Sequence, residues 1–246
     1  MSIYNTLLKL KKANKPFGIQ KAINIMHHSP HSVFIDLDNI ESVVLNDGSI
    51  FRASDQCNML QKVVGNPWFE GIRDTDVAMD IGANIGAVAI PLAKVAKRVI
   101  AVEPLYHQEL NDNLKINKIN NTSIWPVALS ELEDVKVSFS TKSPQWVRGY
   151  TLSQMLYVAE EPVDFLKVDC EGGEWCIDPE EVAGIRELRF EFHIRRNHFN
   201  QDVACLFGDW YDWLVSNSYS FEISEGDAPP PFHEIRECYL LRATKQ

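Results

Sequence analysis

The chain has 246 residues, 45% hydrophobic and 24% charged, with a formal net charge of −10. This composition is ordinary for a globular protein, and the length fits one domain with an elaborated end. No apolar run reaches the ~18 residues of a membrane helix, and the N-terminus lacks the pattern of a signal peptide. The five cysteines are scattered without a Cys-x-x-Cys pair. They argue against a disulfide framework or zinc site and favour a reducing, cytoplasmic location.

The charge is unevenly spread along the chain. Residues 1–35 hold five lysines and no acid, so the remainder carries about −15 (−10 minus +5). Such an acidic body favours a small or neutral substrate over a nucleic acid, whose binding depends on Lys and Arg contacts. A short amphipathic helix is expected over Ile3–Leu10. Its lysines favour a solvated face, with weak contact to an anionic membrane or partner surface as the alternative. The sequence leaves the oligomeric state open.

The first 70 residues form a predicted N-terminal α+β extension, and residues 71–246 form the main domain. The extension is expected to hold short strands at 33–36, 42–45 and 49–52 and a helix over 57–64. In the main domain strands and helices alternate, which is typical of a doubly wound, mainly parallel sheet. Strands are expected at 77–80, 98–103, 123–127, 135–140, 163–169, 187–192, 219–223 and 238–241, and helices at 85–96, 106–117 and 203–217.

The loop Asp80–Gly86 joins the first main-domain strand to its helix, where open α/β sheets bind nucleotide-containing ligands. Gly82 permits a sharp turn and close approach of a ligand to the backbone, and Gly86 permits close helix packing. A dinucleotide fingerprint would have glycine where Asn84 stands. The acid at Asp80 is also unfavourable for a pyrophosphate at a helix N-terminus. A cationic sulfonium ligand without phosphate is compatible with both features, so the loop favours S-adenosylmethionine over NAD.

Glu103 ends the second strand, 21 residues after Gly82, and Pro104 stops that strand. An acid about 20 residues beyond the glycine turn suits hydrogen bonding to ribose hydroxyls. The structural alternative is a glycine turn with a solvated glutamate. The combination in this order favours a cofactor site.

Five segments together resemble the FkbM-type methyltransferases, and the resemblance covers roughly residues 60–225. They are Asp76–Gly86, Val99–Pro104, Pro126–Glu131, Tyr150–Leu152 and Val163–Glu174. The resemblance implies an α/β, class I (Rossmann-like) methyltransferase fold, with a seven-stranded sheet that ends in an antiparallel strand pair. It also implies S-adenosylmethionine as donor and a hydroxyl of a sugar, polyketide or other small molecule as acceptor. Pro179 departs from the family pattern and disturbs the helix expected after Glu174. The cofactor-binding residues predicted in this way are Asp80, Gly82, Ala83, Asn84, Gly86, Glu103, Pro104, Ala128 and Asp169.

The acceptor side is expected after the strand that ends at Asp169. This carboxylate should approach the ammonium of the methionine moiety. Glu171 and Glu174 lie just beyond it beside two glycines, and either is a candidate to orient the acceptor or take its proton. Holding acceptor and methyl group at close distance accounts for much of the rate of such a transfer.

Glu191 and His193 alternate with two phenylalanines on the next strand and therefore share one face. A neutral histidine near its ordinary pKa of ~6.5 is a candidate base. The resemblance also implies an acid and a histidine here. The alternative is that Glu191 pairs with an arginine and His193 is a hydrogen-bonded core residue.

Three further features concern the predicted acceptor side, where these strands end. Asp169, Glu171, Glu191 and His193 offer a donor set that suits Mg²⁺ or Mn²⁺, but no ligand spacing demands a metal and none is expected. Arg195 comes after the strand, either to recognise an anionic acceptor or to compensate the acids. Trp146 lies in a predicted loop, where acceptor contacts are common.

The sequence thus predicts an S-adenosylmethionine-dependent O-methyltransferase acting on a small molecule. An RNA or protein methyltransferase has only the basic N-terminal arm in its favour. A non-catalytic S-adenosylmethionine-binding protein is a third hypothesis, against which the acids at the rim argue. A dehydrogenase is disfavoured by the glycine spacing.

Overall fold

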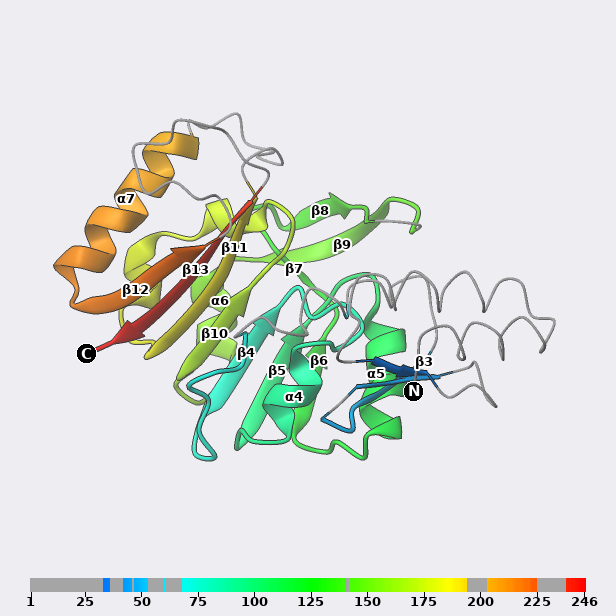
Figure 1. Ribbon diagram of the computed structural model, residues 1–246. Helices are drawn as coiled ribbons and strands as arrows, with labels where there is room; N and C mark the ends of the chain where they lie inside the picture. Colours follow the sequence, from blue (N-terminus) through cyan, green and yellow to red (C-terminus); the bar gives the residue numbers. More distant parts are fainter. Residues whose placement is uncertain are drawn as a thin grey trace, which may run out of the picture.

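A seven-stranded sheet forms the centre of the protein in this computed structural model (Figure 1). The structure describes residues 33–35, 42–45, 47–52, 60, 68–139, 142–193, 203–224 and 238–246. The strands of the central sheet are β4 (Val77–Ile81), β5 (Arg98–Val102), β6 (Thr122–Trp125), β10 (Phe165–Val168), β11 (Glu187–His193), β12 (Tyr219–Ser224) and β13 (Cys238–Lys245). The helices are α4 (Ala89–Ala93), α5 (His107–Ile116), α6 (Leu152–Val158) and α7 (Val203–Ser216), with short 3₁₀ helices η2 (Gly173–Cys176) and η3 (Pro179–Val182).

The strand order is β12-β13-β11-β10-β4-β5-β6. The pairings from β11 to β6 are parallel, and β13 runs antiparallel to both β11 and β12. The predicted doubly wound sheet with an antiparallel C-terminal pair is therefore confirmed. Strand order reverses between β4 and β10, and ligands bind at the carboxyl ends of strands at such a point.

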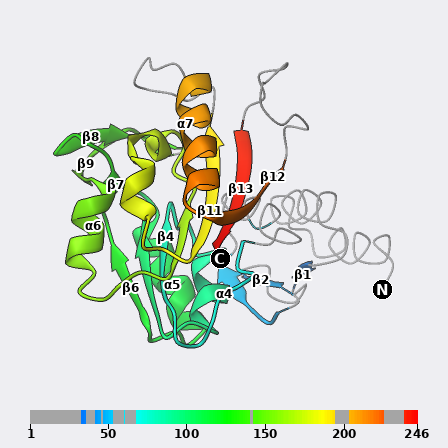
Figure 2. The ribbon, with the colours of Figure 1, turned by 90° about the vertical axis from the view of Figure 1, so that its left-hand side faces the viewer.

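Two hydrophobic cores cover the two faces of the sheet, because buried strand residues alternate between them. One core contains Met79 and Ile81 of β4 together with residues of α6 and α7. The other contains Ala78 of β4 together with residues of α4 and α5. Figure 2 shows α6 and α7 on one side of the sheet and α4 with the N-terminal strands on the other.

Strands β1 (Val33–Ile35), β2 (Ser42–Leu45) and β3 (Ile50–Arg52) form a separate antiparallel sheet, close to their predicted positions. The α5 residue Asn113 and its neighbour Asn117 tie β3 to the main domain. The side-chain oxygen of Asn117 accepts the Ile50 N–H at 2.8 Å, and that of Asn113 accepts the Arg52 N–H at 3.0 Å. The helix predicted over 3–10 and, apart from Leu60, that over 57–64 lie outside the described residues. The boundary at residue 70 stays a prediction.

The helix predicted over 85–96 is wrong in length, because α4 covers only Ala89–Ala93. Asn84 and Gly86 have positive φ angles of 49° and 95°, which are incompatible with a right-handed helix. Pro91 also lacks an N–H to donate. The chain therefore makes turns around the loop before one short helix forms.

A small sheet beside the main one was only partly predicted. The segment expected at 135–140 is β8 (Asp134–Val137), which pairs not with the central sheet but with β9 (Gln145–Tyr150), and β9 pairs with β7 (Ala128–Leu129). Thr151 then starts α6 through a capping box with Gln154.

From Gly173 onward the chain forms the short 3₁₀ helices η2 and η3 instead of one regular helix, in agreement with the expected disturbance. Pro179 takes the first position of η3, after Asp178 as cap. Among the described residues, the helices lack the length and apolarity required to cross a membrane.

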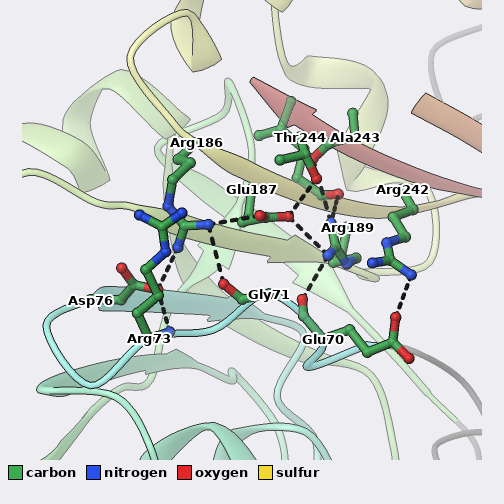
Figure 3. Close-up of polar contacts among 11 residues, drawn as sticks. Glu70, Gly71, Arg73, Asp76, Arg186, Glu187, Arg189, Arg242, Ala243 and Thr244 are labelled. Carbon is green, nitrogen blue, oxygen red and sulfur yellow. Dashed lines mark hydrogen bonds and ion pairs between the residues drawn. The ribbon is translucent and has the colours of Figure 1, made fainter. Parts of the chain in front are cut away.

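A buried ion-pair network closes the amino end of β11 against the turn before β4 (Figure 3). Glu187 accepts hydrogen bonds from Arg186 at 2.6 Å, Arg189 at 2.9 Å and Thr244 at 2.8 Å. Arg189 also donates to the Glu70 carbonyl at 2.7 Å. Glu187 and Arg189 are both buried, so the network stabilises the sheet without facing the cavity described below.

Glu187→Gln is expected to lower the free energy of unfolding by about 1 to 3 kcal/mol, because it removes the negative charge that the buried Arg189 faces. Glu70→Ala is the matched control, since its ion pair with Arg242 is exposed and should contribute at most about 1 kcal/mol. Urea unfolding measures both. Equal losses for the two variants would contradict the structural importance of the buried pair.

Candidate active site

Four adjacent strands present predicted site residues at the same edge of the sheet. Glu103 comes directly after β5, Gly82 after β4 and Asp169 after β10, and His193 ends β11. A cavity of about 420 Å³ lies at this edge. Its lining includes six of the nine predicted cofactor residues: Gly82, Asn84, Glu103, Pro104, Ala128 and Asp169. Apolar residues of β8 and the segments around it form another part of the wall.

Glu103 is held in a fixed orientation by backbone N–H groups. One carboxylate oxygen accepts from Leu105 at 2.7 Å and Tyr106 at 2.9 Å, and the other accepts from Asn84 at 2.8 Å. Burial raises the pKa of the Glu103 carboxyl, while these three donors act in the opposite direction. The result is a preorganised hydrogen-bond acceptor in the cavity wall.

Gly82 and Gly86 of the loop are each required for a different structural reason. Gly82 has a φ of 78°, and a Cβ there would lie 1.8 Å from the Asp169 carbonyl oxygen. Close approach of the β4 and β10 ends therefore requires this glycine, in addition to the predicted sharp turn. A Cβ on Gly86 would lie 2.7 Å from Leu110 of α5, which agrees with the predicted role in helix packing. Asn84 has a positive φ, a conformation that asparagine tolerates better than most residues.

Asp80 requires a correction, because it does not line the cavity. Its carboxylate is fully buried, and its Oδ1 lies 2.9 Å from the Nζ of Lys167 on β10. The same ammonium donates to the carbonyls of Ile81 at 3.2 Å and Gly82 at 2.9 Å. Burial lowers the pKa of Lys167, but the attraction of Asp80 and Asp169 outweighs it, so the pKa is raised. The pair thus supports the loop from beneath. The charge of Asp80 therefore does not select a cationic ligand, because Lys167 compensates that charge.

Four carboxylates surround the imidazole of His193. Its Nε2 lies 3.3 Å from Glu171, 3.6 Å from Glu191 and 3.9 Å from Asp169, and its Nδ1 lies 3.0 Å from Glu174. Asp169 and Glu171 also line the cavity. The structure therefore brings the three predicted catalytic residues, Glu171, Glu191 and His193, together at the end of the cavity wall.

His193 is not a histidine of ordinary pKa, which corrects the expectation of ~6.5. Burial acts to lower the pKa, but the hydrogen bond and charge of Glu174, with the charges of Asp169 and Glu171, raise it to about 9. Glu174 itself is fully buried and accepts from the backbone N–H of His193 at 2.7 Å. Glu174 is therefore placed to hold His193 rather than to contact an acceptor.

The other predicted residues lie away from the cavity or outside the described part of the chain. Trp146 is 71% exposed on β9 and does not line the cavity. Ala83 and Gly86 belong to the loop but not to the cavity lining. Arg195 lies outside the described residues. The alternative that Glu191 pairs with Arg195 therefore stays untested, whereas Arg189 pairs with Glu187.

Sequence reasoning missed two parts of the site. Lys167 carried a signal, because a lysine inside the otherwise apolar strand β10 needs a buried partner. The part of the cavity wall around β8 had no such signal in the sequence, because it depends on how a separate small sheet packs over the strand ends.

Several solved structures of methyltransferases are similar to this chain. An rRNA methylase from Streptococcus thermophilus shares 12% identity over 78% of this chain and 97% of its own, with a TM-score of 0.47. A ribosomal protein L11 methylase from Lactobacillus delbrueckii subsp. bulgaricus shares 12% identity over 77% and 80%, with a TM-score of 0.45. A precorrin-6y C5,15-methyltransferase from Geobacter metallireducens shares 15% over 77% and 88%, with a TM-score of 0.41. Likenesses this distant carry no argument about the acceptor.

Curated proteins provide no match to the chain. The family description "Methyltransferase FkbM domain", in contrast, matches residues 80–223, which is more than half of the chain. The matched range contains the glycine loop, Glu103, Asp169 and His193. The match confirms the predicted methyltransferase and, with it, S-adenosylmethionine as methyl donor. The chain belongs to the FkbM methyltransferase family.

Proposed function

We propose that the protein transfers a methyl group from S-adenosylmethionine to a hydroxyl oxygen of a small molecule, such as a sugar or a polyketide-like compound. The observation that carries the proposal is the position of Glu171. This carboxylate lines the cavity and also contacts His193. A proton acceptor in the wall of the donor cavity is what methylation of a hydroxyl requires.

The residues of the cavity fit the donor. Glu103 offers fixed carboxylate oxygens for ribose hydroxyls. Asp169 follows β10, which is separated from β5 by β4, and it offers a carboxylate for the ammonium of the methionine moiety. Apolar residues of the cavity, including Val102 and Leu105, offer a surface for the adenine ring. When bound, S-adenosylmethionine supplies a methyl group on a positively charged sulfur.

The acceptor chemistry is inferred from the residues around Glu171. We assign Glu171 as the group that receives the hydroxyl proton, because among the three predicted catalytic residues it is the one in the cavity lining. Glu171 has a φ of 61°, unusual for a residue other than glycine, and such strain is common at functional sites. His193 and Glu191 act behind it as positioning residues. Apolar walls exclude water and hold the acceptor near the methyl group.

Glu171→Gln is expected to lower kcat about 100-fold, because an amide cannot accept the proton. Donor affinity should change little, since Glu171 is not assigned to donor binding. The measurement is turnover with an identified acceptor, combined with calorimetric titration of S-adenosylhomocysteine. Glu160→Gln, an exposed site at the end of α6, is the matched control. A kcat within about twofold of wild type would remove Glu171 from the proposed role.

The acceptor class is tested by incubating the protein with methyl-labelled S-adenosylmethionine and separate pools of hydroxylated small molecules, RNA and protein. Label is expected on an oxygen of a compound in the first pool, identified by mass spectrometry. Label found only in RNA or protein would overturn the proposed acceptor and leave the methyltransferase assignment intact. Donor binding without label transfer to any pool would favour a non-catalytic S-adenosylmethionine-binding protein.

A further inference from the structure

Three possible metal ligands converge beside the donor cavity. Asp169 comes directly after β10, and Glu191 and His193 lie on the neighbouring strand β11. One ligand atom from each lies within 4.8 Å of the others. Asp169 is part of the cavity lining, whereas Glu191 and His193 are buried behind it.

The separations suit a bound cation. From the Nε2 of His193, the nearest oxygens of Glu191 and Asp169 lie at 3.6 and 3.9 Å. Atoms spaced by roughly 3 to 4 Å can each lie about 2.1 to 2.3 Å from an ion between them, in the range of metal–oxygen and metal–nitrogen bonds. Glu171, at 3.3 Å from the same nitrogen, is close enough to add a fourth ligand.

Glu174 supplies a second feature that metal sites share. It is fully buried, and its Oε1 contacts the Nδ1 of His193 at 3.0 Å and accepts the His193 backbone N–H at 2.7 Å. A carboxylate on the far ring nitrogen fixes the imidazole and leaves the other nitrogen to face the ion. Trp175 donates to the His193 carbonyl at 2.9 Å and fixes the backbone as well.

The composition of the cluster also suits a cation. Asp169, Glu171, Glu174 and Glu191 place four carboxylates within 4 Å of one imidazole. Carboxylate oxygens are the ligands that hard divalent cations prefer.

We propose that Asp169, Glu191 and His193 bind a divalent cation of the Mn²⁺ or Mg²⁺ type at the end of the donor cavity. Oxygen ligands suit both ions, and the single imidazole favours Mn²⁺. A cation next to Glu171 would bind the acceptor hydroxyl and favour its ionised form. This role in the reaction rests on the proposed function, whereas cation binding itself does not.

The test is direct titration of the full chain, freed of metal with EDTA and then dialysed, with Mn²⁺ as the probe. Electron paramagnetic resonance reports free Mn²⁺. We expect about one equivalent to bind the wild-type protein and Glu191→Gln to weaken binding at least about tenfold. Glu160→Gln is the matched control, since it removes one exposed carboxylate outside the cluster, and it should bind as wild type. Mn²⁺ should also raise the melting temperature of the wild-type protein.

Absence of Mn²⁺ binding by the folded wild-type protein at about millimolar concentration would overturn the proposal, as would unchanged affinity in Glu191→Gln. Near-UV circular dichroism checks that this variant folds. If it does not, His193→Gln takes its place with the same expected loss, and unchanged binding there overturns the proposal. Titration with S-adenosylhomocysteine in EDTA measures the donor site independently. Loss of the cation proposal is thereby distinguishable from loss of the donor site, and the labelled acceptor pools test the proposed methyl transfer separately.

Discussion

Lys167→Met is expected to lower the free energy of unfolding by about 3 to 5 kcal/mol, because it leaves Asp80 as a buried carboxylate without its counter-charge. The Asp80 side chain is fully enclosed, and the Lys167 ammonium lies 2.9 Å from it. The substitution also removes the donor to the Ile81 and Gly82 carbonyls at the start of the cofactor loop. Urea unfolding measures the loss.

The loss should depend on pH. Without Lys167, burial raises the pKa of Asp80 further above that in the unfolded chain, so the folded variant binds a proton that the unfolded chain releases. Stability of the variant should therefore fall as pH rises, and the loss should be larger at about pH 8 than at about pH 5. A loss independent of pH would contradict an uncompensated Asp80 as its cause.

A double-mutant cycle separates the ion pair from packing. Lys167→Met combined with Asp80→Asn removes both charges and should cost less than the sum of the two single variants. Lys115→Met, at an exposed position of α5, is the matched control and should stay within about 0.5 kcal/mol of wild type. Additive losses in the cycle would show that the two side chains stabilise the fold independently.

The strands and the donor site were predictable because their signals are local. Apolar strands such as Val77–Ile81 and Arg98–Val102 are short and end at turn residues, and the residues just beyond parallel strands meet at one edge of the sheet. Glu103 could thus be placed beside the glycine loop from chain order alone. The hydrogen bond from Asn84 to its carboxylate is the contact that this order implies.

The sequence predicted that Glu191 and His193 lie together, but it did not predict the pKa of His193. Alternation along β11 placed Glu191 and His193 on one face, and the structure confirms that they lie together. The raised pKa of His193 depends on Glu174, which reaches the imidazole through the turn at Gly172 and Gly173. No local pattern encodes that approach. Asp80 was misread for the same reason, since its partner Lys167 is distant in sequence and meets it only through the pairing of β4 with β10.

Glu103→Ala is expected to weaken binding of S-adenosylmethionine and S-adenosylhomocysteine at least about 100-fold. Two hydrogen bonds from ribose hydroxyls to a carboxylate contribute about 1.5 to 3 kcal/mol each, and about 1.4 kcal/mol corresponds to a factor of ten. The carboxylate is already oriented by Asn84, Leu105 and Tyr106, so little ordering opposes binding. Isothermal titration calorimetry with S-adenosylhomocysteine measures the loss, and NAD should not bind the wild-type protein.

A folding check and two control variants show whether a loss of affinity in Glu103→Ala comes from lost donor contacts. Alanine at residue 103 leaves the buried N–H groups of Leu105 and Tyr106 without their acceptor, which should cost about 1 to 3 kcal/mol of stability. Circular dichroism must therefore show a folded variant. Glu103→Gln keeps one acceptor oxygen and should lose affinity to a smaller extent, while the exposed Glu160→Ala should bind as wild type. If folded Glu103→Ala binds S-adenosylhomocysteine within about tenfold of wild type, the carboxylate at the end of β5 does not hold the ribose, and the donor must be bound chiefly by the loop and Asp169.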